Sequence, residues 1–285
     1  MRNIQRRRAL CLIPSLIFLG VQPLLAAEMS GRELLEKSAA AYGALESYAG
    51  TTVVISVFAM GEEKLAQTSS AKIQFSRSKL PIAGLNTKRL EDALQLKPKI
   101  RIDGLDTQGG KFAIVGGSKT WQSTKALKDG AWEEAQSLEL AVAAMTGIAM
   151  HAPTLVPAAL LKLNWGYPFT QIENAELEGR DRIDNADCYR VVSDTYLSKR
   201  TFWVDSQNFL LRQMKDERDE DHMANMMSRA PKLPKVEQEK MDAARAGIAK
   251  IKSMMLLHVF AISSVDKPID EAVFEDPTQV KPAAR

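Results

Sequence analysis

Short segments typical of β-strands, separated by turn signals, recur along this chain and constrain its fold more than any other feature. "AGTTVVISVFAM" is dense in β-branched residues and "SSAKIQFSRS" alternates apolar and polar side chains, so the two predict an antiparallel hairpin around "GEEKLAQ". "IRIDG", "KFAIVGG" and "TWQS" continue the pattern, with glycine pairs at the turns. "ELEGRDRIDNADCYRVVSD", "SKRTFWVDSQNFLLRQMKDE" and "LLHVFAIS" bring the predicted total to about nine or ten strands.

A helix is predicted for residues 30–48, before the first of these strands. Ser30 can cap it, and Glu33 follows three residues later, which is the pattern of a capping box. Apolar residues then recur at helical spacing and give the helix one apolar face.

The strand pattern is interrupted at residues 138–163, which are rich in alanine and carry no charge from Leu140 to Leu161. That run is long enough to suggest a membrane span, but Pro153 and Pro157 divide it. We therefore expect two short helices that are apolar on nearly all sides and must be buried. An antiparallel sheet this large must curl or pair, so the sequence predicts an α+β fold. Its centre is a strongly curved antiparallel sheet, an unclosed β-barrel, with helices covering or filling the concave face.

Residues 1–27 have the composition of a cleaved secretory signal peptide, with "MRNIQRRR" before an apolar run and small residues at its end. Removing its four arginines lowers the formal net charge from +3 to −1, so the basic precursor does not indicate a nucleic-acid partner. Cys11 would leave with this segment, and Cys188 alone forms no internal disulfide. We expect a periplasmic protein.

The rest of the chain, 28–285, has no internal repeat and no linker that would divide it, so we expect a single domain. From about 216 to 252 the chain becomes charged and helical in pattern, with "APKLP" as a break. We interpret this segment as an insertion on the surface of the domain.

No catalytic motif is found. "GGSKT" lacks the glycines of a phosphate loop and is better explained as a turn. His151, His222 and His258 fit no metal-binding spacing, and there is no G-x-S-x-G elbow, although a non-local triad remains open. Cys188 is expected to be a buried structural thiol. We therefore expect neither an enzyme nor a cofactor.

"HMANMMS" at 222–228 is the one unusual cluster. His222, Met223, Met226 and Met227 could hold Cu(I), because thioethers suit soft metals. The better explanation is a flexible apolar helix face or lid, since methionine is a common adaptable contact residue. No metal site is predicted.

Several of these segments, taken in order, resemble a known family. "ALESYAGTTVVISV", "PKIRIDG", "LEGRDRIDNADCYRVVSD", "RTFWVDSQNFLLRQM" and the closing "VDKPIDEAVFEDP" cover about residues 30–277. Together they are similar to predicted periplasmic proteins of the outer-membrane lipoprotein-sorting superfamily, with the LolA/LolB-like fold. The charged segment 216–252 departs from the carrier proteins of that superfamily.

The resemblance implies a hydrophobic cavity for acyl chains between the curved sheet and a lid of helices. The ribbon Ser198–Glu217 would then be part of the wall. The apolar faces of the strands give the residues expected to line this cavity: Val53, Ile55, Val57, Ile73, Phe75, Ile100, Ile102, Phe112, Ile114, Phe202, Val204, Leu210 and Met214.

The function expected from these observations is non-catalytic binding of lipid or lipoprotein acyl chains, as a carrier or a sensor, with transient contact with a membrane. One alternative is a protein-interaction or regulatory module that uses residues 216–252 to contact an envelope protein. Another is a hydrolase with a non-local site that includes one of the three histidines.

Overall fold

The computed structural model describes residues 29–77, 98–124, 131–146, 149–163, 172, 174–228 and 250–278. The predicted signal peptide, residues 1–27, lies outside these ranges. Residues 229–249, most of the predicted charged insertion, lie outside them as well.

Eleven strands form one antiparallel sheet in the order β6-β5-β4-β3-β2-β1-β11-β10-β9-β8-β7. The edge strands β6 and β7 do not pair with each other, so the sheet is not closed, which confirms the predicted fold class. The described strands exceed the nine or ten predicted. They are β1 (Ser47–Met60), β2 (Glu63–Ser76), β3 (Lys99–Leu105), β4 (Lys111–Gly116), β5 (Thr120–Ser123), β6 (Glu133–Ala135), β7 (Ala175–Ile183), β8 (Ala186–Asp194), β9 (Lys199–Asp205), β10 (Leu211–Arg218) and β11 (Ser253–Val265).

Tight turns join several neighbouring strands. Gly61 opens the two-residue turn between β1 and β2 with a φ of 66°, in the left-handed region that glycine adopts readily. Asp184 and Asn185 both have positive φ between β7 and β8, as the favoured two-residue hairpin turn requires. The residues of "GGSKT" form the turn between β4 and β5, as predicted.

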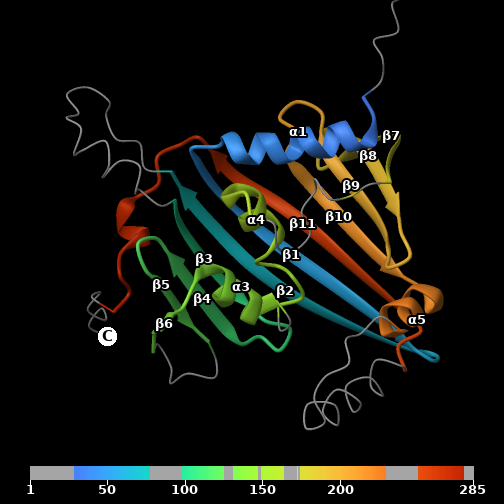
Figure 1. Cartoon of the computed structure of the whole chain (residues 1–285), viewed down its shortest axis with the longest axis horizontal. Helices are drawn as coiled ribbons and strands as arrows, with labels where there is room; N and C mark the ends of the chain where they lie inside the picture. The colour runs from blue at the N-terminus through green and yellow to red at the C-terminus, as the bar shows by residue number, and fades with distance from the viewer. Residues whose placement is uncertain are drawn as a thin grey trace, which may run out of the picture.

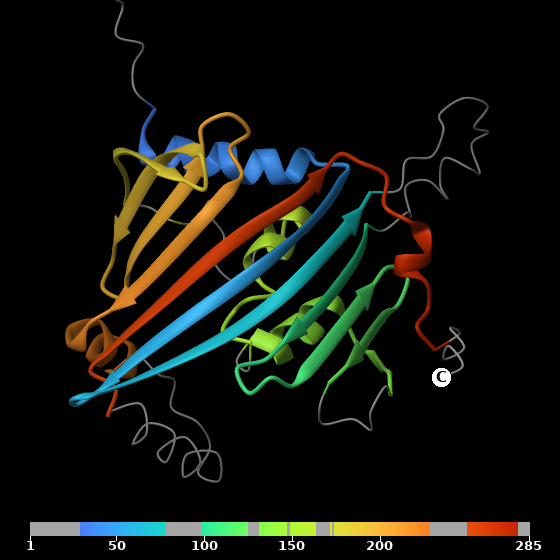
Figure 2. The ribbon, with the colours of Figure 1, turned by 180° about the vertical axis from the view of Figure 1, so that it is seen from behind.

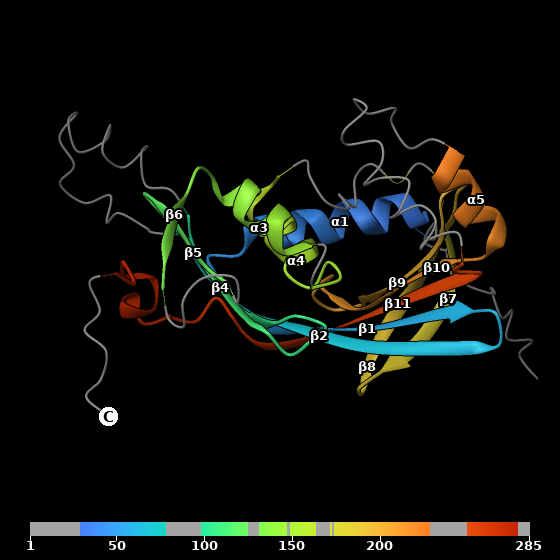
Figure 3. The ribbon, with the colours of Figure 1, turned by 90° about the horizontal axis from the view of Figure 1, so that it is seen from below.

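The helices lie on the inner side of the curved sheet, which Figure 1 shows from the helix side and Figure 3 from below. The predicted capping box is confirmed, because the side chain of Ser30 accepts from the backbone N–H of Glu33 and the Glu33 carboxylate accepts from the backbone N–H of Ser30. The described helices are α1 (Gly31–Ala44), α3 (Leu138–Thr146), α4 (Leu155–Leu161) and α5 (Glu220–Ser228), with a 3-10 turn, η2 (Glu271–Phe274). The two helices expected in residues 138–163 are α3 and α4.

Some predicted boundaries were wrong. Most of "GEEKLAQ" belongs to β2, because the hairpin closes at Gly61 and Glu62 rather than in a long loop. Residues 216–218 continue β10, and residues 253–255 begin β11 instead of ending a helix. The charges of residues 216–218 hid their place in a strand, where Glu217 pairs with Met255 and Arg218 with Met254.

Candidate functional site

The concave face of the sheet is apolar and faces the helices. Most of the residues predicted to line a cavity lie in a buried apolar cluster of the described residues, together with residues of α1, α3 and α4. These residues are Ile73, Phe75, Ile100, Ile102, Phe112, Ile114, Phe202, Val204, Leu210 and Met214. The register places them on the same side of neighbouring strands, as in the pairs Ile73–Ile102 and Met214–Phe202.

The face predicted for β1 was wrong. Val54 is fully buried and Phe58 is 9% exposed, whereas Ile55 is 37% exposed and Val53 and Val57 are half-buried. Strand alternation therefore places Val53, Ile55 and Val57 on the convex side, away from the helices. The sequence could not decide this, because both alternating sets in β1 contain large apolar residues.

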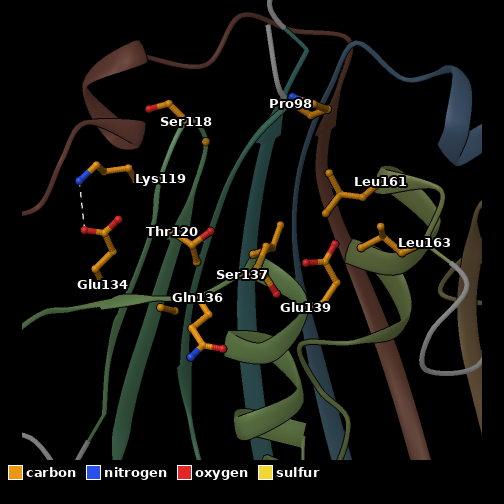
Figure 4. Close-up of a pocket in the computed structure, with 13 residues that line it drawn as sticks. Pro98, Ser118, Lys119, Thr120, Glu134, Gln136, Ser137, Glu139, Leu161 and Leu163 are labelled. Carbon is orange, nitrogen blue, oxygen red and sulfur yellow. Dashed lines mark hydrogen bonds and ion pairs between the residues drawn. The ribbon is translucent and has the colours of Figure 1, made fainter. Parts of the chain in front are cut away.

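A pocket of about 410 Å³ lies where the start of α3 and the end of α4 meet β5, β6 and the turn before β5. Figure 4 shows Leu161 and Leu163 on one side and Thr120, Ser137 and Gln136 beneath. None of the thirteen residues predicted to line the cavity contributes to this pocket. Its apolar wall comes instead from helix α3 and the end of α4, through Leu138, Leu161 and Leu163.

Polar groups surround the same pocket. Lys119 and Glu134 form an ion pair of 3.0 Å at its outer side, visible in Figure 4, and both side chains are exposed. Ser137 accepts a hydrogen bond from the backbone N–H of Leu140 at the start of α3. The pocket therefore combines an apolar wall with a polar rim, and its volume falls in the range of about 300–1,000 Å³ that ligand sites use.

A buried ionic cluster lies elsewhere on the concave side, on β9 and β10. Asp216 is fully buried, and its Oδ2 accepts from the guanidinium groups of Arg200 and Arg218, each at 3.3 Å. Arg200 on β9 lies opposite Asp216 on β10, and Arg218 follows two residues further along β10. All three residues therefore lie on the same face of the sheet. A buried carboxylate needs such partners, because removing a charge from water is costly.

Two histidines lie near this cluster. Burial lowers the pKa of His258 to about 3, aided by the nearby His151 and opposed by Asp216. Neither ring nitrogen of His258 has a hydrogen-bond partner among the described residues, and the centroid of the ring lies 6.2 Å from that of Phe260, with the two rings stacked. Burial also lowers the pKa of His151, together with the positive charges of Arg218 and Arg200. Both imidazoles are therefore neutral at pH 7.

This cluster was not predicted, because the spacing of the three histidines along the sequence does not show which strands bring them near a carboxylate. A signal was available: Asp216 and His258 occupy core-facing positions of the alternating segments "LRQMKDER" and "LLHVFAIS". A charged or titratable residue at such a position indicates a buried polar group that requires partners.

The other residues that the sequence marked as candidates include a histidine and methionines of α5 and a cysteine of β8. His222 on α5 bonds through Nδ1 to Asp219 at 2.6 Å and through Nε2 to the backbone oxygen of Thr195 at 3.0 Å. Met223 is buried, and the side chains of Met226 and Met227 lie outside the described part of the structure. Cys188 is buried, as predicted, and burial raises the pKa of its thiol.

Within the described ranges, no three His, Cys, Asp or Glu side chains gather closely enough to hold a metal ion. No helix found there combines the length and the apolar character that crossing a membrane requires.

No protein-family model matches the chain, and neither does any curated protein. Among solved structures, LprF from Mycobacterium bovis matches with a TM-score of 0.42 and 12% identity, over 87% of this chain and 96% of that one. The lipoprotein LppX from Mycobacterium tuberculosis matches with a TM-score of 0.40 and 12% identity, over 84% and 97%. A LolA superfamily protein from Nitrosomonas europaea matches with a TM-score of 0.32 and 12% identity, over 88% and 99%.

Proposed function

We propose that the protein binds, without catalysis, the hydrocarbon chain of a lipid or lipoprotein on the concave side of its sheet, outside the cytoplasm. The observation that carries this proposal is the concave face itself. Its contiguous apolar surface is covered by short separate helices rather than by a second sheet, and a pocket lies at the junction of the two layers.

Apolar contact alone can drive such binding. Each buried CH₂ contributes about 0.8 kcal/mol, so a 16-carbon chain offers on the order of 12 kcal/mol before the losses of freedom on association. No sequence motif is needed for this, which agrees with the absence of a catalytic motif. The function therefore depends on shape and apolar area rather than on a reactive group.

The pocket between α3, α4 and β5 is the entry point in this proposal. Leu138, Leu161 and Leu163 would contact the chain, and the polar rim formed by Thr120, Ser137 and Lys119 would remain near solvent. Beyond the pocket, the concave residues pack against the helices, so a longer chain must displace α3 or α4. These helices have only nine and seven residues, and α4 packs chiefly against α1.

Filling the pocket tests this proposal. Thr120→Trp should weaken the binding of a fluorescent 16-carbon fatty acid at least about ten-fold, which corresponds to about 1.4 kcal/mol of lost apolar contact. Tryptophan suits a strand, so the fold should persist, and the thermal midpoint of each variant checks this.

The matched control is Leu140→Trp, which adds the same side chain to α3 at a position that is 55% exposed and outside the pocket. It should bind like the unaltered protein. Absence of uptake by the unaltered protein, with no lipid in organic extracts of purified material, would refute the function. Equal binding by both variants would refute the pocket as the entry point.

A further inference from the structure

The convex face of the sheet carries a second apolar surface, which the concave core does not account for. We call it the crest patch, and it consists of three cross-strand pairs on β1 and β11: Val53–Val259, Ile55–Leu257 and Val57–Met255. Figure 2 shows this face, with β11, β1 and β2 in front and α3 and α4 behind them. All six side chains are partly exposed, and Ile55 is 37% exposed.

Such a patch is unusual for this kind of sheet. When one face of an antiparallel sheet packs on the core, the other face is commonly polar. Here β1 and β11 are apolar on both faces, although their concave positions, such as Val54 and Leu256, are already buried. An exposed contiguous apolar patch marks a surface that contacts a protein or a membrane.

The place of the patch favours a flat partner. β1 and β11 are the sixth and seventh strands in the order of the sheet, so they form the middle of its convex side. The middle of a convex surface meets a flat layer first, and the strands on either side curve away.

A basic groove adjoins the patch. It has a volume of about 470 Å³ and is lined by Lys72, Lys111, Arg101, Leu105 and Trp132, among others. Lys72 and Lys111 form no ion pair among the described residues. Asp103 in the groove pairs with Arg101 at 2.8 Å, so its charge is already balanced.

On these grounds we propose that the convex face docks onto an anionic lipid bilayer, with the crest patch in the interface and the basic groove against the headgroups. Lysines near an anionic surface attract it, and tryptophan prefers the boundary between headgroups and hydrocarbon. Apolar side chains, a tryptophan and lysines that form no ion pair with any other described residue fit a bilayer surface better than they fit a protein partner. The proposal does not depend on chain binding at the concave face.

Vesicle flotation of the whole mature chain tests the proposal. The protein should float with vesicles that contain phosphatidylglycerol and not with pure phosphatidylcholine vesicles, and the binding should weaken as salt is added. The double variant Lys72→Gln with Lys111→Gln should reduce partitioning about 25-fold, at about five-fold for each lysine. The control is Lys37→Gln with Lys162→Gln, which removes two lysines on the helix side, one in α1 and one directly after α4. This control should leave the partitioning onto vesicles unchanged.

A second variant tests the apolar part. Ile55→Thr with Leu257→Thr keeps a strand-forming residue at both positions and should also reduce flotation, while fatty-acid uptake remains unchanged. Equal flotation with both kinds of vesicle, or flotation unaffected by either the lysine or the threonine changes, would overturn the proposal. So would a stable dimer in sedimentation that the threonine variant dissolves, because the patch would then contact a second copy of the chain.

Discussion

His258 is a neutral base in the core of the sheet, and its environment predicts how stability depends on pH. Its pKa in the folded protein is about 3, below the ordinary value of 6.5. Between these two values the unfolded chain binds more protons than the folded one, so lowering the pH through this window reduces stability. The protein should therefore lose stability in mild acid without any change in its ion pairs.

We predict that His258→Leu removes much of this acid sensitivity. Two pH units below 6.5, the neutral histidine costs roughly 2–3 kcal/mol relative to pH 7, and leucine has no such cost. Denaturant unfolding at pH 7 and pH 4.5 measures the difference. Part of the acid sensitivity should remain in this variant, because the pKa of the nearby His151 is also lowered.

His222 provides the control, because its pKa is shifted upwards, in the opposite direction to that of His258. Burial alone would lower its pKa, but its hydrogen bonds to Asp219 raise it above 6.5. It therefore stabilises the fold below its unfolded pKa, and that contribution is lost as the pH rises through the folded pKa. His222→Gln should increase acid sensitivity. If His258→Leu unfolds with the same pH dependence as the unaltered protein, the buried histidine is not the cause.

At the scale of elements, α1 is held against β7 by a close backbone approach at its first residue. A Cβ on Gly31 would lie 2.6 Å from the backbone oxygen of Ala175, whereas a Cβ on Gly43 would meet only the flexible side chain of Lys162. Glycine is thus required at one end of the helix and replaceable at the other.

We predict opposite effects for alanine at these two positions. Gly31→Ala should destabilise the protein by about 1–3 kcal/mol, since either α1 or β7 must shift. Gly43→Ala should be neutral or stabilise it by up to about 1 kcal/mol through helix propensity. Thermal unfolding of the two variants measures this, and equal effects would show that α1 does not rest on β7 as described.

The helices and strands differ in how far the sequence alone predicts them. Most strands could be predicted because their side chains alternate and turn residues separate them, and two helices were expected in 138–163 although Pro157, taken as a break, lies within α4. The inward face of β1 could not, because Val54 and Phe58 compete with Val53, Ile55 and Val57, and only pairing with β2 and β11 decides between them. The core-facing positions of Asp216 and His258 could be read from the sequence, but their partners could not, because only the pairing of β9 with β10 places Arg200 opposite Asp216.

At the scale of the whole molecule, the order of strands gives the sheet two distinct faces. β11 returns from the end of the chain to pair with β1, so the two long central strands carry both the middle of the concave core and the crest patch. The alternation of apolar and polar side chains along the strands was enough to predict the curved sheet. The pocket depends on how α3 and α4 meet β5, β6 and the turn before β5, which alternation does not encode.

The most direct test of chain binding on the concave side is photolabelling with a 16-carbon fatty acid that carries a diazirine at the end of its chain. After illumination and proteolysis, mass spectrometry locates the labelled residues. The account predicts labels on the pocket and the concave face, at Leu138, Leu161 or Leu163 and beyond them at Ile114 or Ile102. Labels confined to the convex residues of β1 and β11, or no labelling above that of a heat-denatured sample, would contradict it.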